Sequence, residues 1–239
     1  MYQIKRTFIK PEMKITDLFF ENPSLLLMME HFDLNFILNN KTVEEVCRDN
    51  NINKELFISI ANLYNGFLQV NESNLGIDDL NLIIKFLRNS HQYYINEKYP
   101  EISSLIDLVH QENDTPEIKL VKKFVREYFE DVAEHLDYED KTVFPYFLSL
   151  VSPEAEKKSA TNVSVKIYSE HHSDIESKLD EIKNLLLKHI TLKNDRKLRR
   201  KLLLCILELE NDLQIHSIIE EKVLMPLISK VELHHLNEK

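Results

Sequence analysis

Hydrophobic residues recur along much of this chain at steps of three and four, the period of a helix with one buried face. From this spacing we predict four long helices over about 77–110, 117–150, 162–189 and 193–230, with a kink at Pro100 in the first. The clearest stripes are Leu120, Phe124, Tyr128 and Val132, and Leu203, Ile206, Leu209 and Leu213. Four antiparallel helices joined by short links form an up-down four-helix bundle, so the expected fold class is all-α.

The first 68 residues follow a different pattern, with short apolar stretches between asparagine-rich turns. Thr42 and Glu45 have the spacing of a capping box at the start of one short helix, and another helix is expected from Lys54 to Phe67. Residues 69–76 are polar and include one of only two glycines. We therefore predict a small helical domain over 1–68, a linker over 69–76 and the bundle over 77–239.

Composition narrows the class of protein. Only 2 glycines and 7 prolines in 239 residues leave few breaks, which favours long helices. A formal net charge of −10 argues against binding to nucleic acid or to an anionic membrane. The apolar run 25–29 is too short to span a bilayer, and the start has no signal-peptide pattern. Two cysteines fit a reducing compartment, so the expected location is the cytoplasm.

One eleven-residue pattern occurs twice, from His135 to Pro145 and from His216 to Pro226. Each copy has glutamate four residues after its histidine, Glu139 or Glu220, then a second acid, and proline ten residues after the histidine. Residues four apart lie on one face of a helix, so each copy aims an imidazole and a carboxylate at one point. Two such pairs on two helices of a bundle can hold two metal ions between them.

Histidines also fall on the other predicted helices. His172 shares an apolar face with Ile175 and Leu179, whereas His171 points about 100° away, and the register between the two stays open. His91 and His110 are about 100° out of phase on an ideal helix, which a kink at Pro100 would correct. The remaining histidines have no periodic partner and are expected to be solvated or capping: His31, His189, His234 and His235.

Imidazoles and carboxylates without a thiolate suit iron or manganese better than a closed structural zinc site, with zinc as an alternative. The motifs resemble those of hemerythrin-like proteins, and residues of about 14–231 resemble the bacterial di-iron proteins that repair damaged iron–sulfur clusters. The stretches that carry the resemblance are Ser90-His-Gln-Tyr with Pro100, Leu108-Val-His110, Glu134-His135 to Pro145, Glu170-His-His172 and His216 to Pro226. The resemblance implies an oxo-bridged di-iron centre ligated by His91, His110, His135, His172 and His216, with Glu139 and Glu220 bridging or capping.

The N-terminal part resembles the small helical domain that precedes the bundle in this family. Where that domain usually has a cysteine pair, this chain has Phe36-Ile37-Leu38, and Cys47 is expected to be a core residue. The family implies repair of iron–sulfur clusters after nitrosative or oxidative stress, with iron–sulfur proteins as partners. The alternatives are a protein that binds or senses oxygen or nitric oxide, and a metal-free helical interaction protein. Whether the protein is an enzyme or a homodimer stays open.

Overall fold

The computed structural model describes residues 7–68, 75–151, 173–190 and 196–237. Within these ranges the regular secondary structure is helical, and the only extended pairing is an isolated bridge between Lys14 and Thr42. The predicted all-α fold, a helical bundle preceded by a small helical domain, is therefore confirmed. None of the described helices combines the length and the apolar character that crossing a bilayer requires.

Four short helices precede residue 68: α1 (Ile15–Glu21), α2 (Ser24–His31), α3 (Val43–Asp49) and α4 (Lys54–Tyr64). The predicted capping box is present, because the Glu45 N–H donates to the Thr42 hydroxyl and the Glu45 carboxylate accepts from the Thr42 N–H. The helix expected to reach Phe67 ends at Tyr64. Gly66 follows with a φ of 79°, and the Phe67 N–H bonds back to the Asn62 carbonyl, which closes a left-handed helix end.

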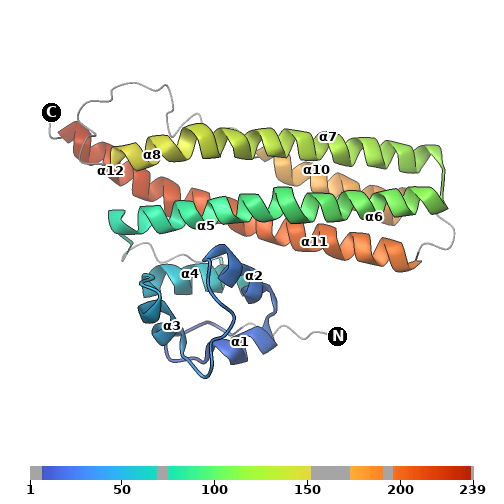
Figure 1. The fold of residues 1–239 in the computed structure, drawn as a ribbon. Helices are drawn as coiled ribbons and strands as arrows, with labels where there is room; N and C mark the ends of the chain where they lie inside the picture. Colours follow the sequence, from blue (N-terminus) through green and yellow to red (C-terminus); the bar gives the residue numbers. More distant parts are fainter. Residues whose placement is uncertain (1–6, 69–74, 152–172, 191–195, 238–239) are drawn as a thin grey trace. The chain divides into compact units, whose positions relative to one another are not determined.

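The later helices are α5 (Leu80–Tyr93), α6 (Tyr99–Glu112), α7 (Pro116–Tyr138), α8 (Phe144–Leu150), α10 (Ser173–Asn184), α11 (Arg196–Ile219) and α12 (Met225–Asn237). The chain divides into two compact units whose borders fall inside α5, α8 and α11. One unit contains the described residues up to Ser90, 147–151 and 215–237, and the other contains 91–146, 173–190 and 196–214. In the second unit α6, α7, α10 and α11 run alongside one another, with α6 and α7 antiparallel (Figure 1). The predicted domain borders at 68 and 77 stay a prediction.

Three of these helical runs contain a π-helical turn shortly before a proline. The turns are Tyr94–Lys98 before Pro100, Glu139–Val143 before Pro145 and Glu220–Leu224 before Pro226. In each case the N–H of the residue preceding the proline bonds to a carbonyl five residues back, that of Tyr94, Glu139 or Glu220. Proline lacks an N–H and its ring clashes with the carbonyl four residues back, and a wider turn accommodates both. The predicted kink at Pro100 thus takes the form of a π turn in a continuous helical run.

The buried face of α7 differs from the predicted stripe. Its core positions include Val121, Val125, Tyr128 and Val132, whereas Leu120 is 62% exposed, so the prediction for Leu120 was wrong. Positions 120 and 121 are both apolar and point about 100° apart, and periodicity alone does not choose between them. The stripe of α11 was predicted more closely, because Ile206, Leu209 and Leu213 are buried.

A buried lysine joins α6 to α11 within the second unit. Lys98 is 7% exposed, and its ammonium forms ion pairs with Glu208 and, at 3.0 Å, with Glu101. Burial by itself lowers the pKa of Lys98, but the hydrogen bonds from its ammonium to Glu208 and Glu101 outweigh burial and raise that pKa above its ordinary value. The apolar stem is packed while the charge is paired, so Lys98 contributes both packing and an ion pair.

Candidate metal centre

The first histidine–glutamate pair lies where α7 passes into its π turn. His135 is in the last turn of α7 and Glu139 opens the π turn, so the pair keeps the four-residue spacing of one helix face. The His135 Nε2 atom lies 3.1 Å from Glu139 Oε1. The other oxygen, Glu139 Oε2, lies 3.4 Å from His91 Nε2, and the Glu139 and His91 side chains are both fully buried. One buried carboxylate therefore faces two different imidazoles with its two oxygens.

The second pair repeats this geometry on the last long helical run. His216 Nε2 lies 3.2 Å from Glu220 Oε1, and Glu220 opens the π turn that precedes Pro226. Glu220 is fully buried and His216 is 5% exposed. On the opposite edge of the ring, His216 Nδ1 lies 2.8 Å from the Ser90 hydroxyl.

The residues that each unit brings together fit a metal ion. His91 and Glu139 are buried together in one compact unit, and His216 and Glu220 are buried together in the other. Buried carboxylates are costly without a compensating charge, which a cation supplies. Ligand atoms about 2.0–2.2 Å from a shared ion lie roughly 3 Å from each other, close to the His–Glu separations seen here. Imidazole and carboxylate together suit iron, manganese and zinc.

Asp140 stands behind His91 and was not predicted to have a role. Its Oδ1 atom lies 3.3 Å from His91 Nδ1, the ring nitrogen that faces away from Glu139. A carboxylate behind a ligating histidine fixes the ring and raises its basicity. The signal in the sequence was the second acid of the repeated motif. In the other copy that position is Glu221, which is exposed.

Two other predicted ligands are not brought into this group. His110 lies near the end of α6, where its Nε2 atom is 3.0 Å from Asp114 Oδ1. Nineteen residues separate it from His91, roughly 28 Å along a helix at 1.5 Å per residue. The charge and hydrogen bonds of Lys119 and His110 hold the pKa of Asp114 below its ordinary value. His172, like its alternative His171, lies outside the described residues.

One of the histidines without a periodic partner has a defined environment. His31 was expected to be solvated or capping, but it is 1% exposed, and its ring packs edge-on to Phe86 with the ring centres 5.3 Å apart. The expectation of a solvated side chain was wrong, because α2 buries the residue at its C-terminal end. The side chains of His189, His234 and His235 lie outside the part of the chain whose burial is described.

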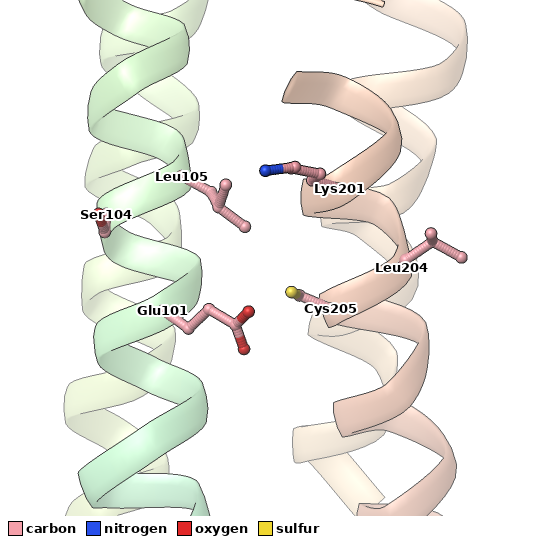
Figure 2. Close-up of a pocket in the computed structure, with 6 residues that line it drawn as sticks. All are labelled: Glu101, Ser104, Leu105, Lys201, Leu204 and Cys205. Carbon is pink, nitrogen blue, oxygen red and sulfur yellow. The ribbon is translucent and has the colours of Figure 1, made fainter. Parts of the chain in front are cut away.

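The two cysteines are buried thiols. Cys47 is 1% exposed in α3, and burial raises its pKa to about 12, consistent with a core residue. Cys205 lines a pocket of about 410 Å³ between α6 and α11, where Figure 2 shows its sulfur and the Glu101 carboxylate projecting from the two helices. Burial, the hydrogen bond with Glu101 and the Glu101 charge raise the Cys205 pKa to about 11. Both thiols are therefore protonated near neutral pH, which makes them poor nucleophiles.

Comparison with known proteins agrees with this geometry. The family model of the hemerythrin HHE cation binding domain matches residues 82–228, more than half of the chain. The matched range contains every residue of both histidine–glutamate pairs, together with His91 and Ser90. A search of curated proteins found no match.

Proposed function

Because this chain belongs to the hemerythrin family of cation-binding helical bundles, we propose that it binds two iron ions and helps to restore iron–sulfur clusters damaged by nitrosative or oxidative stress. The proposed ligands are His91, His135, Glu139, His216 and Glu220. His172 is the proposed ligand from the third long helix. His110 is left out, because its imidazole pairs with Asp114 at the end of α6.

The orientation of Glu139 is the observation that supports two ions rather than one. Its Oε1 atom faces His135 at 3.1 Å and its Oε2 atom faces His91 at 3.4 Å. A carboxylate whose two oxygens face two different imidazoles would help to hold two ions. Glu220, buried beside His216, supplies a second carboxylate from α11 and its π turn. When bound, the iron ions would supply one-electron chemistry and an affinity for small diatomic ligands.

The protein side chains have three tasks in this proposal. Glu139 and Glu220 neutralise part of the metal charge in a buried site, where electrostatic interactions are strong. Asp140 holds the His91 ring from behind. Phe144 stacks on that ring with the ring centres 5.6 Å apart, which gives the site an apolar wall.

The small N-terminal helical domain favours repair over a simple carrier function, since an oxygen carrier needs only the bundle. It does not supply a thiol at the position where the family usually has its cysteine pair. Phe36 and Ile37 stand there, 53% and 79% exposed. We therefore propose that repair by this chain depends on the bundle and does not use cysteine thiols from the segment that contains Phe36 and Ile37. The two free cysteines fit our proposal of a cytoplasmic protein.

The test begins with metal analysis of protein purified without oxygen, where we expect two irons per chain. The protein is then added to an iron–sulfur enzyme inactivated by nitric oxide, and recovered activity is compared with that given by the Glu139→Gln/Glu220→Gln variant. Recovery with the parent protein and none with the variant supports repair. An absence of bound metal would overturn the metal centre, and equal recovery with both proteins would overturn the role of iron in repair.

Oxygen or nitric oxide binding is the second candidate. It is favoured by the burial of His91, Glu139 and Glu220, each with no exposed surface, because only small molecules reach such a site without opening the bundle. The reduced protein is titrated with oxygen and its absorption is followed through repeated removal of the gas. Reversible binding without any cluster recovery would favour a carrier or sensor over repair.

A further inference from the structure

Ser90 is a buried hydroxyl that no ligand assignment includes. It lies near the end of α5 and is 1% exposed. Its Oγ atom donates a hydrogen bond to the Leu87 carbonyl at 2.7 Å. The same oxygen lies 2.8 Å from Nδ1 of His216. These are close, well-formed contacts inside one of the two compact units.

The two contacts together define which ring nitrogen of His216 carries hydrogen. A serine hydroxyl has one hydrogen to donate and two lone pairs to accept with. When that hydrogen goes to the Leu87 carbonyl, Oγ can only accept from His216, which requires hydrogen on Nδ1. The neutral ring then has its lone pair on Nε2, the atom that faces Glu220 at 3.2 Å. That lone pair is the group a metal ion binds.

The spacing of residues along the sequence also supports a role for Ser90 beside the ligands. Ser90, Tyr94 and Pro100 stand at the same intervals as His135, Glu139 and Pro145, and as His216, Glu220 and Pro226. In this third copy Tyr94 opens the π turn, and its hydroxyl donates to Asp212 at 2.7 Å, with both side chains buried. Where the other two copies carry ligands, this copy carries hydrogen-bonding groups that contact α11.

We propose that Ser90 is a positioning residue of the metal centre: it accepts from Nδ1 of His216 and so presents Nε2 to the metal. This inference rests on the proposed function only in that the centre binds metal. Removing a group that hydrogen-bonds to a metal-ligating histidine typically lowers metal affinity about 10–100-fold. We therefore expect Ser90→Ala to weaken metal binding by roughly that factor, whereas Ser90→Thr, which keeps the hydroxyl, restores it.

The experiment uses the full chain and zinc, which is diamagnetic and has no redox chemistry of its own. Zinc affinity is measured by competition with a chromophoric chelator for the parent protein, Ser90→Ala, Ser90→Thr and the control Ser104→Ala, whose serine is exposed on α6. Circular dichroism verifies that each variant is folded. Nitrogen-15 NMR of the histidine rings reports the protonated nitrogen of His216, assigned by comparison with His216→Gln.

In the zinc-loaded parent protein we expect hydrogen on Nδ1 of His216 and zinc on Nε2, with this signature weakened in Ser90→Ala and kept in Ser90→Thr. Zinc bound through Nδ1 in the parent protein would overturn the inference even if no variant folds. Unchanged affinity and an unchanged His216 signature in Ser90→Ala would also overturn it. A parent protein that binds no metal would instead remove the proposed metal centre, which keeps the two failures apart.

Discussion

Glu220 and Glu221 are adjacent acids with opposite environments, and they give a matched test of the metal centre. Glu220 is fully buried beside His216, whereas Glu221 is exposed. Glutamine is nearly isosteric with glutamate, so Glu220→Gln removes a charge without leaving a cavity. We expect Glu220→Gln to weaken metal binding strongly and Glu221→Gln to leave it unchanged.

The size of the effect follows from the burial of Glu220. Breaking a buried charge pair by removing one partner costs about 3–5 kcal/mol. At about 1.4 kcal/mol per factor of ten, this corresponds to roughly two to four powers of ten in metal affinity. Metal that binds only the folded state stabilises it by mass action. For a chain of this size about 1 kcal/mol shifts the melting temperature by roughly 2–4 °C, so up to about 6–20 °C of metal-dependent stabilisation is lost.

The assay is a thermal melt of the parent protein and of both variants, with iron under anaerobic conditions and after chelation. The parent protein and Glu221→Gln should show the same rise in melting temperature with metal. Glu220→Gln should show little or none of it, while its chelated form melts cooperatively. A full metal-dependent rise in Glu220→Gln, or its loss in Glu221→Gln, would refute the assignment of Glu220 as a ligand.

Three further predictions concern groups on α6, α7 and α11 and in the π turn before α6. His135→Ala should lower the measured iron content, whereas His110→Ala should leave it unchanged, because the His110 imidazole pairs with Asp114. Lys98→Met should lower the free energy of unfolding, measured in urea, by about 1–2 kcal/mol. This value lies between those of exposed and buried ion pairs, because Glu208 is half exposed. The pKa of Lys98 is raised, so this difference should persist below the ordinary lysine pKa of about 10.4 and shrink at higher pH; a constant difference to pH 12 would contradict the ion pair. With its pKa raised to about 11, Cys205 should react with iodoacetamide at pH 8 roughly a hundredfold more slowly in the folded protein than in urea, as followed by mass spectrometry; equal rates would contradict its burial.

Much of this architecture was predictable because it depends on local spacing. The capping box of Thr42 and Glu45 needs only two residues three apart, and it formed as expected. The pairs His135–Glu139 and His216–Glu220 need only one helical turn each, and both have their nitrogen and oxygen atoms 3.1–3.2 Å apart. Over four residues the helix geometry leaves little freedom.

The prediction for His110 shows where such spacing is insufficient. It considered only the angle between His91 and His110 around the helix axis, which a kink at Pro100 would adjust. The rise along the axis, roughly 28 Å over nineteen residues, is not adjusted by a change of phase. Ser90 and Asp140 were missed for a different reason. Their partners, His216 and His91, are distant in sequence, and only the packing of helices brings them together.

The π turns have a consequence for how these helices tolerate changes of length. A π turn contains about one residue more than an α-helical turn, so each one is equivalent to a single-residue insertion held at a fixed place. Residues beyond Glu139 and Glu220 are therefore rotated by about 100° relative to an uninterrupted α-helix. Deleting one residue from such a turn would remove this extra residue, so the run would return to α-helical winding with its later side chains still facing their present neighbours. In this protein a one-residue deletion within the turn before Pro145 or Pro226 would therefore act locally. The same deletion in the α-helical part of either run would rotate the whole remainder of the helix by about 100°.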